Sequence, residues 1–190
     1  ECREELGLLD TDKVLIHVGR FHESKNHSFL IDIFTSYLSS HQNTKLVLVG
    51  DGVLRKEIEN KCLNNGVYRN VIFTGVRDDV PRILQIADVF IFPSNWEGLP
   101  VSVVEAQAAG LPTLISDHVT RDVELTDLCS YLPINKGVTA WVEAIEKAIL
   151  SSKKNEIKKI KESGFDIYQS ACWLTDFYRR IIDEKLYYTP

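Results

Sequence analysis

Short apolar runs typical of β-strands alternate along this sequence with longer segments whose apolar residues recur at helical spacing. The strand-like runs are residues 14–18, 45–49, 71–73, 88–92 and 112–116, with 131–132 as a candidate sixth. The helix-like segments are residues 28–40, 54–64, 81–87, 99–109 and 138–150. This alternation predicts an α/β fold in which a single Rossmann-like domain is built on a doubly wound parallel sheet.

The loops that follow the expected strands should all lie at one edge of the sheet, because crossovers between parallel strands are right-handed. These loops are residues 20–27, 50–52, 76–80 and 93–99. Open α/β sheets bind ligands in the crevice outside the carboxyl ends of their strands. A ligand site is therefore expected along this edge.

Two glutamates, Glu97 and Glu105, follow the fourth expected strand, the first in a loop and the second two turns into a helix. Pro100 suits the first helical position, and the free N–H groups there favour a bound anion. The helix is apolar at Val101, Val103, Val104, Ala106, Ala108 and Ala109. Such a helix is expected to be largely buried, so Glu105 needs a polar partner from the protein or from a ligand. The alternative is a glutamate on an exposed helix edge.

Two cations, Arg20 and Lys25, follow the first expected strand and should lie on the same ligand edge. Two positive side chains beside a helix N-terminus can hold a diphosphate without a metal ion. The alternative is that both are ordinary surface charges.

Composition limits the function further. The 190 residues suffice for one ordinary domain, and a net charge of −5 gives no basic field for nucleic acid. No apolar run approaches the roughly 20 residues of a membrane span, and the N-terminus lacks a signal-peptide pattern. The four cysteines are scattered without C-x-x-C spacing. A reducing cytoplasm is the expected location.

Several well-known site motifs are missing. The G-x-G-x-x-G turn that begins at Gly50 has Arg55 at its third glycine position, so NAD or FAD is not expected. The sequence has no P-loop and no G-x-S-x-G elbow, and its five histidines lack metal-ligand spacing. His17 lies inside an expected strand and is interpreted as a core histidine. No cofactor and no metal are expected.

The C-terminal part of the chain differs in character. Residues 153–161 are basic, which is typical of a solvated helix face, with an anionic membrane surface as the alternative partner. Residues 166–185 form a long helix-like segment that is rich in aromatic residues. This segment is longer than one sheet domain needs and could reach a neighbouring domain.

With these elements in order, the chain resembles the C-terminal, donor-binding domain of family 4 retaining glycosyltransferases, and most closely bacterial exopolysaccharide and capsule enzymes. The likeness is carried in sequence by Val18-Gly19-Arg20-Phe21 with Lys25, Leu48-Val49-Gly50-Asp51-Gly52, Phe73-Thr74-Gly75, residues 87–94, Glu97-Gly98-Leu99-Pro100, Glu105-Ala106 and Ala109-Gly110-Leu111-Pro112. Each piece is weak alone, but their order and spacing together are specific. The chain departs from the common family pattern at Asn26, where glycine often follows the lysine.

The resemblance implies roles for the acidic and basic residues. Arg20 and Lys25 would hold the diphosphate of a nucleotide sugar, and Glu105 would accept hydrogen bonds from the ribose hydroxyls. Glu97 would contact sugar hydroxyls. Together Glu97, Arg20 and Lys25 would form the catalytic group, because cations stabilise the charge that develops on the departing diphosphate.

The resemblance also implies the surroundings of the donor. The backbone of Gly98, Leu99 and Pro100 would approach the sugar and the phosphates, and the loop at Arg77 and Val80 would lie beside the base. UDP is the nucleotide that the family uses most often. The family transfers its sugar with retained anomeric configuration and usually needs no metal.

The implied architecture has two Rossmann-like domains facing a cleft, the GT-B arrangement. Residues 1–165 would form the nucleotide-sugar-binding domain and residues 166–190 a helix that crosses back onto an N-terminal acceptor domain absent from this chain. The isolated domain is therefore expected to be inactive as a hexosyltransferase. The full protein would be cytoplasmic, with peripheral association at the inner face of the membrane if its acceptor is lipid-linked.

Two other functions stay open on the sequence. A nucleotide-sugar epimerase of the same two-domain fold would also bind a nucleotide sugar. A non-enzymatic nucleotide-binding or receiver-like module is the third alternative, although Asp51, Asp78 and Asp79 do not form the acidic cluster of a receiver.

Overall fold

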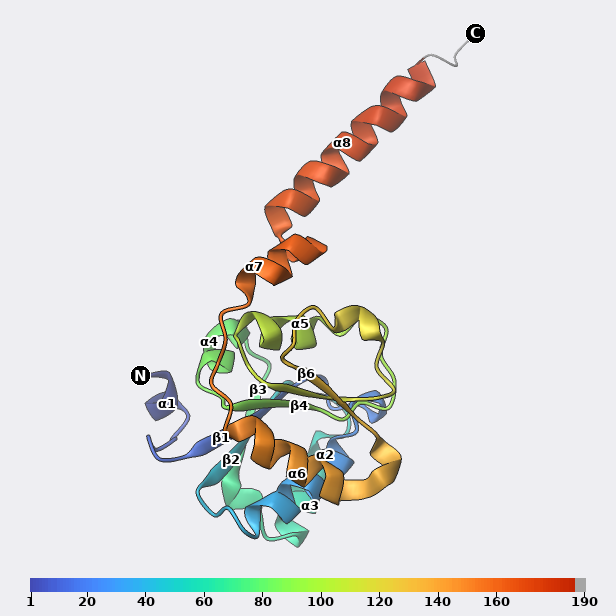
Figure 1. The fold of residues 1–190 in the computed structure, drawn as a ribbon. Helices are drawn as coiled ribbons and strands as arrows, with labels where there is room; N and C mark the ends of the chain where they lie inside the picture. The colour runs from blue at the N-terminus through green and yellow to red at the C-terminus, as the bar shows by residue number, and fades with distance from the viewer. Residues whose placement is uncertain (187–190) are drawn as a thin grey trace.

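The computed structural model describes residues 1–186 and contains one six-stranded sheet in which every neighbouring pair of strands is parallel (Figure 1). The strands are β1 (Lys13–Val18), β2 (Thr44–Val49), β3 (Val71–Gly75), β4 (Val89–Phe92), β5 (Thr113–Ser116) and β6 (Cys129–Leu132). Their order across the sheet is β3-β2-β1-β4-β5-β6. The chain thus winds outward from β1 in one direction and from β4 in the other, which is the topology of a doubly wound sheet.

Helices cover both faces of the sheet (Figure 1). One face carries α2 (His27–Leu38), α3 (Arg55–Asn64) and α6 (Gly137–Ile149), and the other carries α4 (Val80–Gln85) and α5 (Val101–Ala108). Successive strand residues alternate between two hydrophobic clusters, so that Leu15 packs with the first group of helices and Ile16 with the second. The predicted α/β fold with a doubly wound parallel sheet is confirmed.

The shorter elements lie mostly at the ends of the strands and helices. They are α1 (Cys2–Glu5) and the 3-10 turns Glu23–Lys25, Tyr68–Asn70, Arg121–Val123 and Ile134–Lys136. Two boundaries differ from the sequence prediction in a way that matters here. β3 continues past Phe73 to Gly75, and Pro100 is the N-cap of α5 rather than its first helical residue. The backbone of Pro100 is extended, with ψ at 99°, so the helix begins at Val101.

After α6 the chain crosses the end of the sheet as an extended strap, residues 150–156, and returns to the face that carries α5 (Figure 1). The Lys154 backbone N–H donates to the Gly110 carbonyl at 3.2 Å. Gly110 has a φ of +77°, and a Cβ atom there would lie 2.3 Å from the Lys154 oxygen, so only glycine fits beneath the strap. A short helix, α7 (Ile157–Ile160), then packs against α5.

The basic segment is therefore only partly what its composition predicted. Residues 153–156 are not helical, and Lys154 and Lys159 each bind the Asp127 carboxylate at 3.1 Å, which holds the pKa of Asp127 at about 2. Lys154 thus connects the strap, and Lys159 connects α7, to the loop before β6. Lys158, in contrast, is largely exposed, as expected for a solvated face.

The last helix, α8 (Ile167–Leu186), follows a π-helical turn at Lys161–Phe165 and extends away from the sheet (Figure 1). Its aromatic residues Tyr168, Trp173, Phe177 and Tyr178 are exposed to solvent. Cys172 on this helix is also exposed. The division into a domain at 1–165 and a crossover helix at 166–190 stays a prediction, and its last four residues lie outside the described part.

Candidate functional site

The candidate site lies at the carboxyl edge of the sheet, which is the edge where the six parallel strands end. β1 and β4 are neighbours, with Leu15 opposite Val89 and Ile16 opposite Phe90. The chain leaves them in opposite directions, toward β2 and toward β5. Doubly wound sheets bind their ligands at such a topological switch point, which here lies between the loops of residues 19–26 and 93–100.

Lys25 and Glu97 form an ion pair between these two loops. The Lys25 Nζ atom lies 2.7 Å from Glu97 Oε1, and the two side chains are only 16% and 12% exposed. Lys25 Nζ also lies 4.9 Å from the centre of the Phe92 ring, within reach of a cation–π interaction. Glu97 Oε1 is buried and has no hydrogen bond of good geometry, so its contact with Lys25 is an ion pair. The site thus concentrates one positive and one negative group in a partly dry environment.

Arg20 lies on the same loop as Lys25, directly after β1, and its side chain is exposed. Within residues 1–182 the Arg20 guanidinium makes no hydrogen bond or ion pair. Its backbone is fixed by the neighbouring loop after β2, because Gly19 donates to Val49 and Phe21 to Asp51. A Cβ atom on Gly50, whose φ is +133°, would lie 2.2 Å from the Gly19 oxygen. The two loops therefore touch backbone to backbone.

Asn95 connects the loop of Glu97 to the loop of Lys25. Its backbone N–H donates to the Ser24 carbonyl at 2.7 Å, and its side-chain amide donates to the Glu23 carbonyl at 2.9 Å. Asn26 donates to the Asn95 side-chain oxygen at 3.2 Å. Asn26 has a left-handed backbone, with φ at 53° and ψ at 43°. Asparagine tolerates this conformation best after glycine, which explains the departure from the family pattern at this position.

Two buried histidines lie beneath Lys25. His17 on β1 bonds the Ile91 carbonyl through Nδ1 at 2.8 Å, while its Nε2 and both ring nitrogens of His27 have no hydrogen-bond partner among the described residues. The His27 ring stacks on Phe21 at 4.2 Å and meets the edge of His17 at 4.7 Å. Burial, opposed in His17 by the bond to Ile91 and aided by the charge of Lys25, lowers the pKa of His17 to about 4. Burial and the neighbouring His17 lower that of His27 to about 2. Both rings are neutral near pH 7 and pack with Phe21 as an aromatic layer beneath Lys25.

Glu105 lies in the second turn of α5 and is half-buried. Burial raises the pKa of its carboxyl, and within residues 1–182 the carboxylate has neither a hydrogen bond nor an ion pair. The expectation that α5 is largely buried holds for Val103, Val104 and Ala106, whereas Val101 is 57% exposed. Glu105 is thus a partly desolvated carboxylate whose acceptor atoms are available to a ligand.

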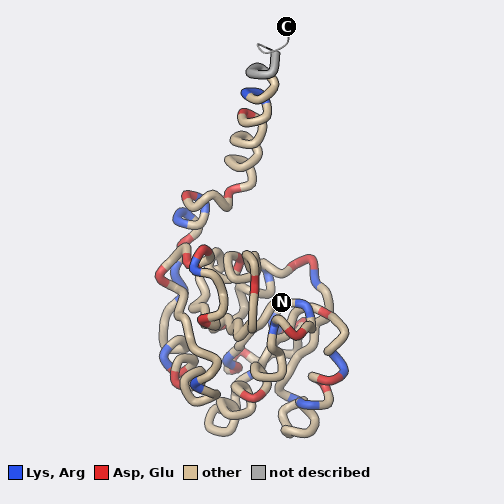
Figure 2. Tube along the Cα trace, turned by 90° about the vertical axis from the view of Figure 1, so that its right-hand side faces the viewer, with Lys and Arg blue, Asp and Glu red and all other residues tan. Residues whose placement is uncertain are grey.

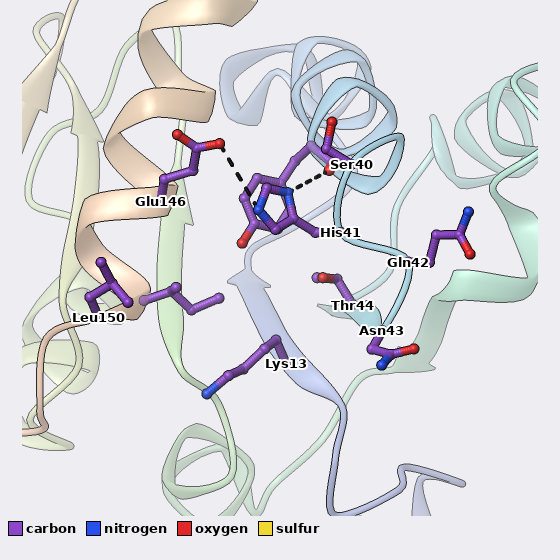
Figure 3. Close-up of a pocket in the computed structure, with 10 residues that line it drawn as sticks. Lys13, Ser40, His41, Gln42, Asn43, Thr44, Glu146 and Leu150 are labelled. Carbon is purple, nitrogen blue, oxygen red and sulfur yellow. Dashed lines mark hydrogen bonds and ion pairs between the residues drawn. The ribbon is translucent and has the colours of Figure 1, made fainter.

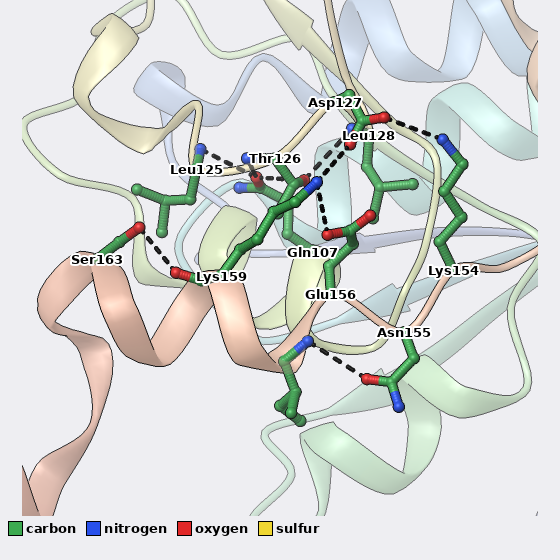
Figure 4. Close-up of polar contacts among 11 residues, drawn as sticks. Gln107, Leu125, Thr126, Asp127, Leu128, Lys154, Asn155, Glu156, Lys159 and Ser163 are labelled. Carbon is green, nitrogen blue, oxygen red and sulfur yellow. Dashed lines mark hydrogen bonds and ion pairs between the residues drawn. The ribbon is translucent and has the colours of Figure 1, made fainter.

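The rotation of α5 is fixed by Gln107, a further polar residue of this helix, which is fully buried. Its amide donates to the carbonyls of Val103 and Val123, and its oxygen accepts from the backbones of Leu125 and Thr126 and from the Thr126 hydroxyl. Figure 4 shows this cluster beside the Asp127, Lys154, Glu156 and Lys159 ion pairs. The sequence analysis did not single out Gln107, although a polar residue within an apolar helix indicates a buried side chain that needs hydrogen-bond partners.

The remaining predicted residues lie at the rim of the site or away from the pair. Gly98 and Leu99 are exposed in the loop before α5, and Pro100 is buried. Arg77 makes a two-pronged contact with Asp79 at 2.8 and 2.9 Å and lies 3.8 Å from Glu5, which together raise its pKa. These partners direct Arg77 toward the N-terminal segment.

Val80 is the first residue of α4 and is half-buried. Within the described residues, no hydrogen bond or ion pair links Val80 or Arg77 with Lys25, Glu97 or Glu105. Their assignment to the base stays a prediction.

A sizeable cavity lies elsewhere. It has a volume of about 710 Å³ and opens at the amino edge of the sheet, between Lys13, His41 and Glu146 (Figure 3). The His41 ring stacks on Tyr37, bonds the Tyr37 carbonyl at 3.1 Å and reaches Glu146 only at 4.0 Å. Lys13 pairs with Asp88 and His41 with Tyr37, so two of the charged or titratable groups at this cavity are already engaged, and we favour the carboxyl edge as the functional site.

Metal, membrane and charge features add little to this picture. Among the residues that the structure describes, no group of three or more His, Cys, Asp or Glu side chains could hold a metal ion. In the same part of the chain, no helix is both long and apolar enough to cross a bilayer. Basic and acidic residues are interspersed along the Cα trace in Figure 2.

Comparison with known proteins gives a consistent result. The family model described as Glycosyl transferases group 1 matches residues 1–164. EpsF of Bacillus subtilis (strain 168) is 37% identical over 172 residues, covering 88% of this chain and 45% of that protein. UDP-Gal:alpha-D-GlcNAc-diphosphoundecaprenol alpha-1,3-galactosyltransferase of Escherichia coli is 26% identical over 194 residues, covering 95% of this chain and 49% of the enzyme.

Solved structures share the fold. Anabaena Alr3699/HepE in complex with UDP and glucose superposes with a TM-score of 0.80 at 20% identity, covering 94% of this chain and 50% of that one. WaaG, a glycosyltransferase involved in lipopolysaccharide biosynthesis, superposes with a TM-score of 0.70 at 24% identity, covering 85% of this chain and 44% of that one. The chain spans about half the length of the curated relatives it matches.

Proposed function

The chain belongs to the glycosyl transferases group 1 family, and from this premise we propose that it is the donor-binding half of a hexosyltransferase that uses a nucleotide-diphosphate sugar, UDP-sugar foremost. The observation that carries the proposal is the juxtaposition of Lys25 and Glu97 at the β1–β4 switch point. Switch points of doubly wound sheets are where such folds bind nucleotides. Anabaena HepE, which shares the fold, was crystallised with UDP and glucose.

The diphosphate would be held by Lys25, Arg20 and the N-terminus of α5. Arg20 is exposed and uncommitted within the described part of the chain, so its guanidinium can turn toward a phosphate. Lys25 is already fixed near the switch point by Glu97 and Phe92. Cations and backbone N–H groups preorganised around a diphosphate stabilise the negative charge that develops as it departs. The chemistry asked of these residues is leaving-group stabilisation.

The rest of the donor would contact the two glutamates. Glu105 has free acceptor atoms and a raised pKa, and a carboxylate in a half-buried place gains most from two neighbouring hydroxyl donors such as those of a ribose. Glu97 would exchange part of its contact with Lys25 for sugar hydroxyls while Lys25 turns to the phosphates. The backbone of Gly98, Leu99 and Pro100 would border the sugar.

The whole enzyme would be larger than this chain. We assign to it the GT-B arrangement of family 4, retention of anomeric configuration, no metal requirement and a role in polysaccharide biosynthesis. An N-terminal domain would bind the acceptor and receive α8, whose apolar side chains are exposed here. A cytoplasmic enzyme at the inner membrane face fits a lipid-linked acceptor such as the diphosphoundecaprenol conjugate in the name of the Escherichia coli relative.

Calorimetry with UDP tests the proposal on this chain. Removing the charge-assisted contact of Lys25 or the paired acceptors of Glu105 should each cost about 2 kcal/mol, which is roughly a thirtyfold weaker Kd. The variants are Lys25→Ala and Glu105→Ala. Lys45→Ala is the matched control, because Lys45 bonds the Arg69 carbonyl near the amino edge. Unchanged binding in both site variants would overturn the assigned roles.

A further inference from the structure

We propose that Asn95 is a positioning residue that holds Lys25 and Glu97 in contact. The effect of Asn95 on nucleotide binding rests on the proposed function, whereas its effect on the ion pair does not. Asn95 lies two residues before Glu97 in the same loop. Its partners Glu23, Ser24 and Asn26 lie in the loop of Lys25, and two of them flank the lysine. The residue therefore joins the two backbones that carry the ion pair.

The bonding of Asn95 requires an amide side chain. One end donates to the Glu23 carbonyl and the other accepts from Asn26, while the backbone N–H donates to Ser24. An alanine would keep only the backbone bond. An aspartate would lose the donor to Glu23, because an ionised carboxylate only accepts hydrogen bonds.

Asn26 supports the same reading from the other side. It is the N-cap residue of α2, a position where asparagine usually accepts from the first backbone N–H groups of its helix. Here its side chain makes no capping bond and donates to Asn95. The side chain is thus diverted from its ordinary structural role to the link between the two loops.

A third loop is tied to the same residue. His118, which follows β5, meets the Asn95 carbonyl through Nδ1 at 3.1 Å, so that this nitrogen must carry the proton and donate. Asn95 consequently links the loops after β1, β4 and β5. Displacing Asn95 changes the separation of Lys25 and Glu97, and an active site loses most of its catalytic effect when its groups are held loosely.

A double-mutant cycle on thermal unfolding tests the geometry without any nucleotide. Asn95→Ala and Glu97→Gln are measured singly and together. If Asn95 sets the ion pair, loosening the pair leaves less for the second change to remove, and the Tm shifts deviate from additivity by about 2 °C or more. Asn70→Ala is the matched control, since Asn70 donates one similar bond, to the Thr44 carbonyl at the amino edge. Its shift should add to that of Glu97→Gln, and additive shifts for Asn95 would overturn the inference.

Calorimetry with UDP tests the functional consequence. Asn95→Ala should weaken UDP binding about tenfold at a temperature where the variant is folded, while Asn70→Ala binds as the unchanged chain does. Asn26→Gly keeps the left-handed backbone, loses only the bond to Asn95, and should weaken binding to an intermediate degree. It also replaces Asn95→Ala in the cycle should that variant not fold.

The two proposals fail in different ways. Full UDP affinity in Asn95→Ala overturns the positioning role while the donor site stands. Absence of UDP binding in the unchanged chain overturns the UDP assignment, and the cycle with Glu97→Gln then still decides whether Asn95 sets the ion pair.

Discussion

The buried histidines beneath Lys25 make the stability of this chain depend on pH between 6.5 and 4. In the unfolded chain both imidazoles have the ordinary pKa of about 6.5, whereas in the folded chain the pKa of His17 is about 4 and that of His27 about 2. Above pH 6.5 neither state holds these protons and the folded state keeps its full stability. Below pH 6.5 the unfolded chain binds protons that the folded chain rejects, so acid favours unfolding.

The size of the effect follows from the two pKa values. Each pKa unit corresponds to about 1.4 kcal/mol, so His17 removes roughly 3 kcal/mol between pH 6.5 and 4, and His27 at least as much. The lowered pKa values of Asp79 and Asp127 act below pH 3.8 and leave this window clear. The raised pKa of Glu105 acts in the opposite sense near the low end. A loss of about 6 kcal/mol is comparable to the whole stability of an ordinary domain.

Urea unfolding at pH 7.5, 6.5, 5.5 and 4.5 measures this dependence. The free energy of unfolding should fall with a slope that approaches two protons, and His17→Phe should remove about one proton from that slope. His22→Gln is the control for replacing a histidine, because His22 is exposed on the loop that follows β1. A free energy that is flat from pH 6.5 to 4.5, or an equal slope in His17→Phe, would refute the argument.

Two further predictions concern the supports of the site. Gly50→Ala should destabilise the chain by about 4 kcal/mol in urea unfolding, because the new Cβ meets the Gly19 oxygen at 2.2 Å. The control Gly66→Ala is also at positive φ but has nothing within 4 Å, so it should cost about 1 kcal/mol. Equal losses would show that the contact between the loops is unimportant. Gln107→Leu should cost about 3 kcal/mol, since it leaves buried backbone groups of the loop before β6 without partners; a loss under 1 kcal/mol would contradict the role given to this amide.

The sequence was sufficient for the sheet because its strands are buried on both faces and read as continuous apolar runs. The predicted strand ends fell within two residues of the observed ones for β1, β2, β3, β4 and β5. Pro100 was misplaced by one position, since a proline suits both the N-cap and the first helical turn, and only the backbone angle distinguishes them. For the same reason, the helix was predicted to begin at residue 99, two residues before its observed start at Val101.

The candidate site was predicted less completely. Placing Lys25 and Glu97 on one edge follows from strand order, but their contact and the bridge through Asn95 depend on loop conformations that no periodicity encodes. The argument that a polar residue in an apolar helix needs partners was applied to Glu105, yet Gln107 is the residue that satisfies it within the protein. Glu105 is instead left with free acceptor atoms, which is the arrangement that a ligand requires.

The central claim is that a nucleoside diphosphate binds at the carboxyl edge of the sheet, and amide shift mapping of the isotope-labelled chain during a UDP titration tests it most directly. The account predicts saturable shifts at Gly19, Lys25, Gly98 and Glu105, with none around the amino-edge cavity of Figure 3. Shifts confined to Lys13, His41 and the other residues of that cavity, with the carboxyl edge unmoved, would contradict it.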